Sequence, residues 1–446
     1  MSEEEATLEE FAESNDPATG ERIETPIGEL PSDWAVEWLD DICSINSDGF
    51  SEDNWPDETF EYISLSDVSE GTIIQSETTA IDDAPSRAQR RIKEGDVLVG
   101  TVRPKQVSHG FVTEEYDGKI CSSGFGVLRS PANLNPLYLL QEVLSRRFFR
   151  QMEAYVAGSG YPAVKIGDLR KHRIAVPPLE EQRKIASVLY TVDQVIRKTD
   201  EVIRQIKRSK KGVMQEVFTE GYFDHQFKSI NGKKIPKEWD LVPIGELYDR
   251  IDSGGTPRRG EDKYWNNDYM PFVKIEDMTG RELRGISETE EYTTKDAIAD
   301  NQTKTFSEGA LLIAIYGSIG KTAFANRKLS TNQAIVGLEN PKADRNYLRY
   351  VIDYHQANLK SLSRQTTQAN ISQGILKKFQ VPVPNKTEQE KISDLLISID
   401  NNLKQEGNIK HQLMSLKKGL MQELLSGEVR THDKDIELVE NVLKHG

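Results

Sequence analysis

The feature that most constrains this chain is an internal repeat at a separation of 207 residues. The segment VPPLEEQRKIASVLYTVDQVI (176–196) aligns with VPVPNKTEQEKISDLLISIDNNL (381–403), and KKGVMQEVF (210–218) aligns without a gap with KKGLMQELL (417–425). Because a duplicated unit fixes the order of the parts, we expect globular, helical, globular and helical segments in turn.

The two copies diverge upstream of these helical segments. LPSDW (30–34) pairs with IPKEW (235–239), and EGDVLVGTV (94–102) pairs with EGALLIAIY (308–316). YISLSDV, which starts at residue 62, pairs with FVKIEDM, which starts at residue 272, and the offsets vary between 205 and 214. We therefore predict globular parts that differ by loop insertions, joined to rigid helices.

Both helical segments carry one narrow apolar stripe. The stripe positions of the first copy alternate in spacings of four and three residues: Ile185, Leu189, Val192, Ile196, Thr199, Ile203, Ile206, Lys210, Val213 and Val217. The second copy offers Ile392, Leu396, Ile399, Leu403, Leu413, Leu420 and Leu424, interrupted by Glu406 and Lys410. This 3.5-residue period is typical of a coiled coil.

The two stripes are expected to pair with each other. One helix leads into the second globular part and the other leads out of it, so the pair should be antiparallel. A helix of 38 residues is about 57 Å long, which suits a spacer between two globular parts. An ordinary packed helix pair would explain the stripe but not its length or its duplication.

Length and composition narrow the class of protein. A chain of 446 residues predicts two to three domains. Its two cysteines, Cys43 and Cys121, provide neither a disulfide framework nor a thiol zinc site, which favours a reducing cytoplasm. Its apolar stretches are shorter than the roughly 20 residues of a membrane span, and MSEEEATLEEF at the N-terminus lacks signal-peptide features. We expect a cytoplasmic protein.

Charge is unevenly distributed along the chain. Residues 1–85 hold 25 acidic residues and one basic residue, whereas residues 86–446 hold 56 basic and 47 acidic residues. An acidic N-terminal region thus precedes a mildly basic body. This pattern allows either contact between the body and a polyanion or an acidic tail on an ordinary surface.

The segment LLIAIYGSIGKTAF (311–324) resembles a phosphate-binding loop but fails its pattern. That loop requires G-x-x-x-x-G-K-[ST], so that backbone N–H groups between two glycines can surround a phosphate. The first glycine position is Ile315, and the matching segment VLVGTVRPKQVSHGFV contains no G-K-T. A β-hairpin in both copies is a simpler interpretation than a phosphate loop in one of them. Lys321 in the second copy, or Arg103 at the neighbouring position of the first copy, would then be carried outward at the hairpin tip.

These motifs resemble the specificity subunit of type I restriction-modification systems. The resemblance rests on the P-x(3-4)-E-Q-x-K-I-x(3)-L entry into each helix, KKGLMQELLSGEVR, SGGTPRRGEDKYW (253–265) with MPFVKIEDM, and TTQANISQGILKKFQVPVP (366–384). It covers about residues 25–430. It implies two target-recognition domains, each reading one half of a bipartite double-stranded DNA target, and a helical spacer that docks methyltransferase subunits and their restriction subunits.

The first copy departs from these motifs. It shows SDGFSEDNWPDETFEY in place of the G-G-T-P and Y-W elements, and its GSGYPAVKIGDL is a looser form of TTQANISQGIL. The resemblance assigns the methyl donor and ATP to partner subunits, so no cofactor is expected in this chain.

Catalytic motifs do not emerge from the sequence. An adenine methyltransferase needs [ND]-P-P-[YFW], and VPPL lacks the polar first residue. The seven histidines show no metal-ligand spacing, so no metal site is predicted. GEDKYW reads as a turn with solvated charge. We therefore expect a non-catalytic DNA-recognition subunit.

The expected fold class is α+β, with two target-recognition domains carrying curved β-sheets, separated by an antiparallel two-helix coiled coil in an internal pseudo-twofold repeat. The expected division is an acidic disordered tail (1–24), target-recognition domain 1 (25–178), spacer helix 1 (179–220), target-recognition domain 2 (221–384), spacer helix 2 (385–427) and a C-terminal tail (428–446).

The candidate DNA-binding residues are polar or cationic side chains expected on loops, because such groups reach base edges and phosphates. In the first domain they are Arg87, Arg90, Arg91, Arg103, Lys105, Ser159, Tyr161 and Lys165. In the second they are Thr256, Arg258, Arg259, Tyr264, Lys274, Ser318, Lys321, Asn332, Gln333, Gln365, Thr366, Thr367, Gln368 and Asn370.

Three alternatives remain open at this point. The first is the specificity subunit of a related type II-like system with the same domains. The second is a phosphate-loop nucleotide-binding protein that uses Lys321 and Thr322. The third is a coiled-coil adaptor for protein partners.

Overall fold

A computed structural model of the chain describes residues 21–51, 55–156, 162–230, 232–280, 285–363 and 370–444. The chain forms two compact units. Unit 1 comprises Met1–Lys198 and Lys410–Gly446, and unit 2 comprises Thr199–Ile409. Each unit therefore contains one globular part together with one end of each of two long helices.

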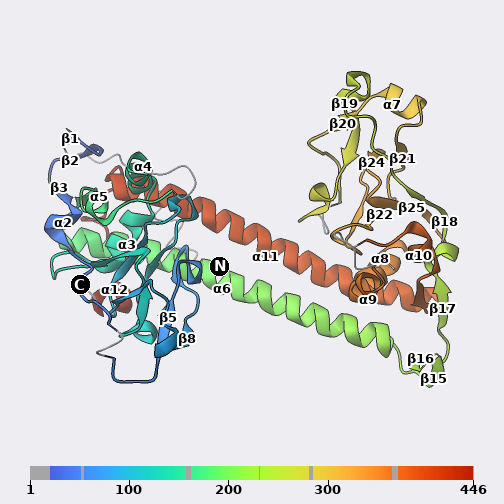
Figure 1. Cartoon of the computed structure of the whole chain (residues 1–446), viewed down its shortest axis with the longest axis horizontal. Coiled ribbons are helices and arrows are strands. Elements are labelled where there is room, and N and C mark those ends of the chain that lie inside the picture. Colours follow the sequence, from blue (N-terminus) through green and yellow to red (C-terminus); the bar gives the residue numbers. More distant parts are fainter. Residues whose placement is uncertain are drawn as a thin grey trace. The chain divides into compact units, whose positions relative to one another are not determined.

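The two long helices keep the repeat offset of 207 residues at both ends. α6 spans Leu179–Thr219 and α11 spans Lys386–Ser426, 41 residues each (Figure 1). At 1.5 Å per residue each helix is about 62 Å long. Unit 1 pairs the start of α6 with the end of α11, and unit 2 pairs the end of α6 with the start of α11. The predicted antiparallel coiled coil is confirmed.

The predicted apolar stripe is the buried seam of this pair. All ten stripe positions of α6 are buried or half-buried. In unit 1, Ile185 and Leu189 share a core with Leu424 of α11, and in unit 2, Val217 shares a core with Ile392. Each end of the coiled coil is thus continuous with the core of the globular part beside it.

The seam also contains one ion pair in each unit, and the two pairs are related by the repeat. In unit 1, Lys417 Nζ lies 2.6 Å from Asp193 Oδ1, and in unit 2, Lys210 forms an ion pair with Asp400. All four side chains are at most 17% exposed. Because a displaced register would leave a charge buried without a partner, these pairs favour one alignment of the helices.

The globular part of unit 1 is built on two mixed sheets. A six-stranded sheet has the order β4-β13-β10-β11-β7-β6, and a four-stranded sheet has the order β8-β5-β12-β9. Val97 and Val99 of β10 face the core shared with the helices, whereas Leu98 faces the core shared with the four-stranded sheet. The alternation of inward and outward side chains along a strand thus supplies both cores.

The elements of unit 1 besides the long helices are β1 (Arg22–Thr25), β2 (Gly28–Pro31), β3 (Ala35–Trp38), α2 (Leu39–Ile42), β4 (Ser44–Ile45), β5 (Thr59–Ile63), β6 (Val68–Ser69), β7 (Gly71–Ile73), β8 (Glu77–Ala80), β9 (Ala88–Arg91), β10 (Val97–Gly100), β11 (His109–Phe111), β12 (Ile120–Ser122), β13 (Phe125–Arg129), α3 (Pro136–Leu144), α4 (Arg146–Ala154), α5 (Ile166–Leu169), β14 (Arg173–Val176) and α12 (Glu440–Lys444).

The globular part of unit 2 repeats this plan with two four-stranded sheets, ordered β18-β25-β22-β23 and β20-β19-β24-β21. Leu311 and Ile313 of β22 face the helices, and Leu312 faces the second sheet. The antiparallel pair β22–β23 matches the pair β10–β11 of unit 1, so the predicted hairpin occurs in both copies.

The elements of unit 2 besides the long helices are β15 (Phe227–Ile230), β16 (Lys233–Pro236), β17 (Asp240–Pro243), β18 (Tyr248–Ser253), β19 (Trp265–Val273), β20 (Tyr292–Thr293), α7 (Lys295–Ala299), β21 (Lys304–Phe306), β22 (Leu311–Ala314), β23 (Thr322–Phe324), β24 (Leu329–Thr331), β25 (Ile335–Pro341), α8 (Arg345–Tyr354), α9 (Gln356–Ser361), α10 (Gln373–Lys378) and β26 (Gln380–Val383).

A tryptophan in each unit fixes the start of a long helix. Trp34 Nε1 donates to Glu181 Oε2 at 3.0 Å, and Trp239 Nε1 donates to Glu388 Oε2 at 3.0 Å. Both glutamates lie in the first turn or two of their helices and are at most 1% exposed. The paired motifs LPSDW and IPKEW are therefore the points at which each globular part is bonded to a helix.

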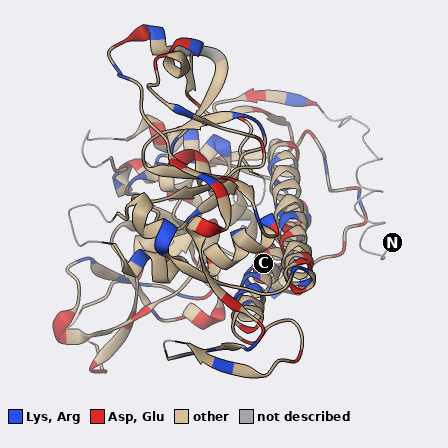
Figure 2. Ribbon diagram, turned by 90° about the vertical axis from the view of Figure 1, so that its right-hand side faces the viewer, with Lys and Arg blue, Asp and Glu red and all other residues tan. Residues whose placement is uncertain are grey.

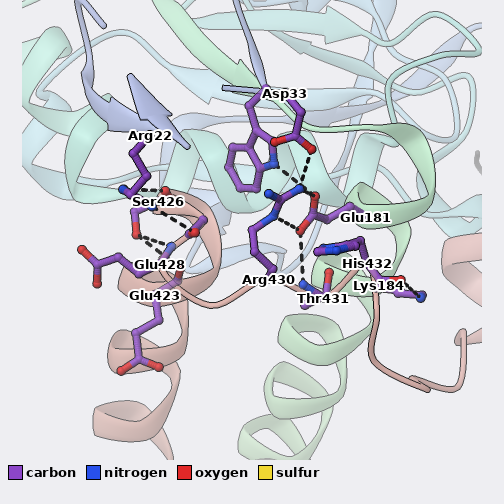
Figure 3. A network of polar contacts seen from close by, with 12 residues as sticks. Arg22, Asp33, Glu181, Lys184, Glu423, Ser426, Glu428, Arg430, Thr431 and His432 are labelled. Atoms are coloured by element: carbon purple, nitrogen blue, oxygen red, sulfur yellow. Dashed lines mark hydrogen bonds and ion pairs between the residues drawn. The ribbon is translucent and has the colours of Figure 1, made fainter. Parts of the chain in front are cut away.

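The second carboxylate oxygen of each glutamate meets a different cation in the two units. In unit 1, Arg430 Nε donates to Glu181 Oε1 at 2.9 Å, and Arg430 Nη2 donates to Asp33 Oδ2 at 2.6 Å (Figure 3). In unit 2, His225 takes this place, with Nε2 2.7 Å from Glu388 Oε1 and Nδ1 3.0 Å from Glu238 Oε2.

The described part of the N-terminal segment is more ordered than the sequence suggested. Residues 1–20 of the expected acidic tail lie outside the described residues, but residues 22–24 belong to β1, which pairs with β2. Arg22 Nη1 donates to the Gly427 carbonyl oxygen at 3.1 Å. The expected disordered tail is thus wrong for residues 22–24, because a single arginine anchors this acidic stretch to the end of α11.

The C-terminal segment is packed against unit 1. Val442 of α12 is fully buried in the main core, and Asn135 Nδ2 donates to its carbonyl oxygen at 2.9 Å. Lys184 Nζ donates to the carbonyl oxygens of His432 and Lys434, each at 3.0 Å. This segment therefore completes the unit 1 core.

Removing one member of a seam ion pair should destabilise the unit that contains it. Lys417→Met leaves the largely buried Asp193 carboxylate without its cation, and we expect the free energy of unfolding to fall by about 3–5 kcal/mol. Urea denaturation measures this, with the exposed neighbour Lys418→Met as control. The pairing is refuted if Asp193→Leu combined with Lys417→Met is no more stable than Lys417→Met alone.

Unit 2 should lose stability at alkaline pH through His225. Burial alone would lower the pKa of His225, but hydrogen bonds to Glu388 and Glu238 outweigh it and raise the pKa above the ordinary 6.5. A raised folded-state pKa stabilises the fold fully below about pH 6.5, and this contribution disappears as pH rises through the raised value.

Thermal unfolding followed from pH 6 to pH 9 tests this expectation. The melting temperature of His225→Gln should fall less over this range than that of the wild type. The control is His411→Gln, an exposed position on α11, which should follow the wild type. Equal pH profiles for the wild type and His225→Gln would contradict the assignment.

Candidate nucleic-acid interface

In both units, two neighbouring parallel strands end side by side. In unit 2, β19 pairs with β24, with Val273 opposite Thr331, and in unit 1, β5 pairs with β12, with Ile63 opposite Cys121. Residues that follow parallel strands come together at one edge of the sheet, a place where α/β proteins commonly bind ligands.

The unit 2 edge, defined as Thr256, Lys274, Asn332 and Gln333, brings together four of the residues selected from the sequence. Lys274 follows β19, and Asn332 and Gln333 follow β24. The Asn332 N–H donates to the Val273 carbonyl oxygen at 3.2 Å, and Thr256 Oγ1 donates to Gln333 Oε1 at 2.6 Å.

Two glycines allow the segment around Thr256 to reach this edge. A Cβ on Gly254 would lie 2.1 Å from the Thr331 carbonyl oxygen, and a Cβ on Gly255 would lie 2.9 Å from the Gln302 carbonyl oxygen. The glycines of the SGGTP motif are therefore required by close approach of backbone to backbone, and not by a phosphate.

Beside this edge, one carboxylate binds two of the predicted cations. Glu291 Oε2 accepts a hydrogen bond from Arg259 Nη1 at 2.6 Å, and Glu291 Oε1 accepts one from Lys274 Nζ at 3.0 Å. Burial alone would raise the pKa of Glu291, but the bonds from Lys274 and Arg259 lower it, which keeps the carboxylate ionised. Sequence reasoning missed Glu291, because nothing in its local pattern distinguishes it from its acidic neighbours.

Two other residues of this loop have different environments. Arg258 is 75% exposed and forms an ion pair with Glu261 at 3.1 Å. Tyr264 is only 4% exposed, and its hydroxyl donates to Asp300 Oδ2 at 2.9 Å. Its selection as a surface contact is corrected: the ring fills the interior and supports the loop.

A second group of candidates in unit 2 surrounds the β22–β23 hairpin. Ser318 is exposed at its tip, whereas Lys321 is half-buried and immediately precedes β23, so Lys321 does not lie at the hairpin tip as expected. Tyr316 forms a β-bridge with Asn370, which places Asn370 beside this hairpin. The candidates Gln365, Thr366, Thr367 and Gln368 lie outside the described residues.

Unit 1 repeats this juxtaposition. The hairpin β10–β11 carries Arg103 and Lys105, both exposed, and the Arg103 N–H donates to the Pro162 carbonyl oxygen at 2.8 Å. Val102 bridges to Ala163, the position that matches Asn370 in the repeat. Lys165 is exposed just beyond it, and the candidates Ser159 and Tyr161 lie outside the described residues.

The arginines around β9 divide into three environments. Arg87 is exposed, and its carbonyl oxygen accepts from the Ser123 N–H at 2.7 Å, so it lies beside the end of β12. Arg90 is half-buried, and burial lowers the pKa of its guanidinium. Arg91 lies over the Trp55 ring, with Cζ 5.7 Å from the ring centroid, and faces a cleft away from the strand ends.

At the strand ends, unit 1 has Ser64 and Ser122 in the places where unit 2 has Lys274 and Asn332. Ser64 follows β5 and receives the same support as Lys274: the Ser64 N–H donates to Asp67 Oδ2 at 2.9 Å, and the Lys274 N–H donates to Asp277 Oδ2 at 2.7 Å. Sequence reasoning overlooked Ser64, although the alignment of YISLSDV with FVKIEDM places it opposite Lys274.

The phosphate-loop alternative finds no support. Such a loop opens into a helix, but Thr322 begins strand β23. Thr322 is 1% exposed, and its hydroxyl donates to Asp353 Oδ1 at 2.5 Å, so it cannot reach a phosphate or a metal ion.

Charge distribution, possible metal ligands and helix hydrophobicity further restrict what kind of site the chain can carry. Both basic and acidic residues are distributed along the long helices (Figure 2), and residues 204–211 of α6 hold five basic and no acidic residues. Within the described ranges no cluster of three or more His, Cys, Asp or Glu is arranged to hold a metal ion. In that same part of the chain, no helix has the length and apolar character that a membrane span requires.

Comparison with known proteins identifies two copies of one domain in this chain and relatives that match most of its length. A family model described as the type I restriction modification DNA specificity domain matches residues 31–208 and 236–414. A putative type I restriction enzyme specificity subunit from Methanocaldococcus jannaschii is 25% identical over 422 residues, covering 91% of this chain and 96% of the relative. A specificity subunit from Haemophilus influenzae is 20% identical and covers 89% of this chain and 100% of the relative.

Solved structures share the fold. A chain from a study of complex assembly and conformational transition in a type I restriction-modification system has a TM-score of 0.55 and 23% identity, with 90% of this chain and 99% of that chain covered. The S subunit from M. genitalium has a TM-score of 0.55 and 13% identity, with 90% and 98% covered. With its duplicated fold, twin strand edges and two matched copies of the domain, the chain belongs to the type I restriction-modification specificity subunit family.

Proposed function

We propose that this chain is the non-catalytic, sequence-reading subunit of a type I restriction-modification complex. It binds double-stranded DNA whose target consists of two short specific blocks separated by unspecified base pairs. Residues 25–178 and 221–384 act as the two target-recognition domains. The helical segments 179–220 and 385–427 set the distance between the blocks, and 428–446 is the C-terminal segment.

One observation carries this proposal: the same framework presents different chemistry in its two copies. The strand ends supported by Asp67 and Asp277 carry Ser64 in unit 1 and Lys274 in unit 2. Sequence readout depends on donors and acceptors at base edges, so a conserved frame with exchanged side chains suits two readers of different sequences.

The residues proposed to contact DNA are those that the fold places on the exposed loops and strand ends. In unit 1 these are Arg87, Arg103, Lys105 and Lys165, together with Ser64. In unit 2 these are Thr256, Arg258, Arg259, Lys274, Ser318, Asn332, Gln333 and Asn370, with Lys321 at the side of the hairpin. Ser159, Tyr161 and Gln365–Gln368 stay predictions.

The proposed partners are methyltransferase subunits, which would supply the methyl donor, and restriction subunits, which would use ATP. A function on cellular DNA places the chain in the cytoplasm, in keeping with the buried, unpaired Cys43 and Cys121. A related type II-like system with the same domains would use the same readers and differ only in the partner that cleaves.

The bipartite target can be tested in cells. We expect that cells expressing this chain with its cognate methyltransferase subunits acquire one methylated motif made of two blocks and a fixed spacer, detectable by methylome sequencing. Cells expressing the methyltransferase subunits alone serve as control. A continuous motif, or methylation that does not depend on this chain, would refute the proposed function.

Helix length should determine the spacer. Inserting seven residues after Glu201 in α6 and seven after Asn408 in α11, midway between the two seam ion pairs, keeps both ion pairs and the phase of the seam and adds about 10 Å. At about 3.4 Å per base pair we expect a spacer about three base pairs longer, with both blocks unchanged. Methylome sequencing reads this directly, and changed blocks beside an unchanged spacer would count against the spacer role.

Close approach at Gly254 should be needed for reading by unit 2. Gly254→Ala forces a Cβ against the Thr331 carbonyl oxygen, which displaces Thr256 from Gln333. Loss of well-placed base contacts typically costs about 1–3 kcal/mol, so we expect binding to the target duplex to weaken by roughly 5- to 100-fold. The control is Gly260→Ala in the same loop, where a Cβ meets nothing within 4 Å; equal effects of both variants would refute this role.

A further inference from the structure

The unit 2 edge presents hydrogen-bond donors because its amide oxygens are engaged within the protein. Gln333 Oε1 accepts from Thr256 Oγ1 at 2.6 Å, and Asn332 Oδ1 accepts from the Ala334 N–H at 3.1 Å. This arrangement leaves the NH₂ groups of both amides as donors for a ligand. Lys274 adds a third donor at the same edge.

Arg259 is held beside this edge in a fixed orientation. Its Cζ lies 4.0 Å from the centroid of the Trp265 ring, and Trp265 packs edge-on against the fully buried Phe272 at 5.0 Å. Its Nη1 is bonded to Glu291 at 2.6 Å. A guanidinium fixed by a ring face and a carboxylate keeps its remaining N–H groups in a constant direction.

Glu291 also limits what these cations can do. Its two carboxylate oxygens bind Arg259 and Lys274, and the Phe272 N–H donates to its carbonyl oxygen at 2.9 Å, which anchors its backbone to β19. A carboxylate between two cations reduces their attraction for phosphates, because that attraction depends strongly on net charge. Directed hydrogen bonds to bases remain available, because these depend on orientation.

We propose that the unit 2 edge reads the major-groove edge of guanine and that Glu291 is the positioning residue for this readout. This inference rests on the proposed function. Guanine presents two acceptors, N7 and O6, in the major groove, whereas adenine and cytosine present a donor and thymine presents one acceptor with a methyl group. The amide NH₂ groups of Asn332 and Gln333 and the Lys274 ammonium are all donors, and this set is therefore matched to guanine.

Unit 1 provides an internal contrast. Ser64 occupies the place of Lys274, and its hydroxyl donates to Asp67 Oδ2 at 2.6 Å. That bond uses the hydroxyl hydrogen, so the Ser64 oxygen is left as an acceptor and the unit 1 edge lacks the donor that Lys274 supplies in unit 2. The guanine preference is therefore assigned to unit 2 alone.

Modified bases test the readout. The probe is a duplex carrying the target motif that methylome sequencing identifies. It is bound by the complex of this chain with its methyltransferase subunits. Each guanine in turn is replaced by 7-deazaguanine, which lacks the N7 acceptor, or by inosine, which keeps N7 and O6. We expect one guanine in one block at which 7-deazaguanine weakens binding by about 5- to 100-fold and inosine does not.

Glu291→Gln tests the positioning role. This variant should lose the discrimination between guanine and 7-deazaguanine at that site. It should also bind a scrambled duplex more tightly, with the slope of log K against log salt concentration steeper by about 0.9 for each phosphate that a released cation contacts. A merely structural role would weaken binding to all duplexes and leave that slope unchanged or shallower.

Glu276→Gln is the matched control. It removes one carboxylate that also pairs with Lys274, at 3.5 Å, but Glu276 is 83% exposed and holds no second cation in the described structure. This variant should keep the guanine discrimination. Thermal unfolding of both variants checks that they fold, and the modified duplexes test the wild type even if Glu291→Gln does not fold.

The outcomes separate this inference from the function on which it rests. A wild-type complex that binds target and scrambled duplexes equally overturns the proposed function, and the guanine readout with it. A wild-type complex that prefers the target but binds every 7-deazaguanine duplex as tightly as its parent overturns only the guanine readout. Retention of the discrimination by Glu291→Gln overturns the role of Glu291.

Discussion

Two buried carboxylates, Glu181 and Glu388, determine how each globular part is joined to the long helix that follows it. A carboxylate that is at most 1% exposed is costly unless every oxygen is bonded, and here each receives a tryptophan N–H, a backbone N–H and a cationic partner. These partners come from separate parts of the unit, so the helix can begin in one place only. The seam ion pairs Asp193–Lys417 and Lys210–Asp400 then fix the alignment of α6 with α11.

The two copies of the repeat bond their buried glutamates with residues from different places in the chain. In unit 2 the chain continues from α6 through Tyr222 and His225, which bind Glu388 directly. In unit 1 the corresponding partners, Arg430 and Thr431, come after α11, and Arg22 joins the first strand to the end of that helix. An arginine does not titrate in the accessible range and a histidine does, so two joints of the same design differ in their response to pH.

The sequence predicted well whatever depends on local periodicity. The 3.5-residue stripe identified the seam, and the ungapped offset gave two helices whose ends match residue for residue. It predicted poorly whatever depends on pairing between variable loops: Glu291 lies 17 residues from Lys274, and only the fold brings them together. Composition misled at residues 22–24, where acidity suggested disorder, and Tyr264 looked like a surface contact because its neighbours are charged.

The backbone at the strand ends is held by bonds that do not involve the side chains offered to DNA. This explains how such a chain can change the bases that it contacts without losing its fold. Lys274 and Ser64 are held by the same bond from backbone to an aspartate three residues later, although their side chains differ in charge, length and hydrogen-bonding capacity. Neither side chain contributes to the main cores, which are formed by strands such as β10 and β22 and by the helices. A substitution at the strand end therefore changes the donors and acceptors offered to a base while the free energy of folding, set by those cores and by the two buried carboxylates, is largely preserved.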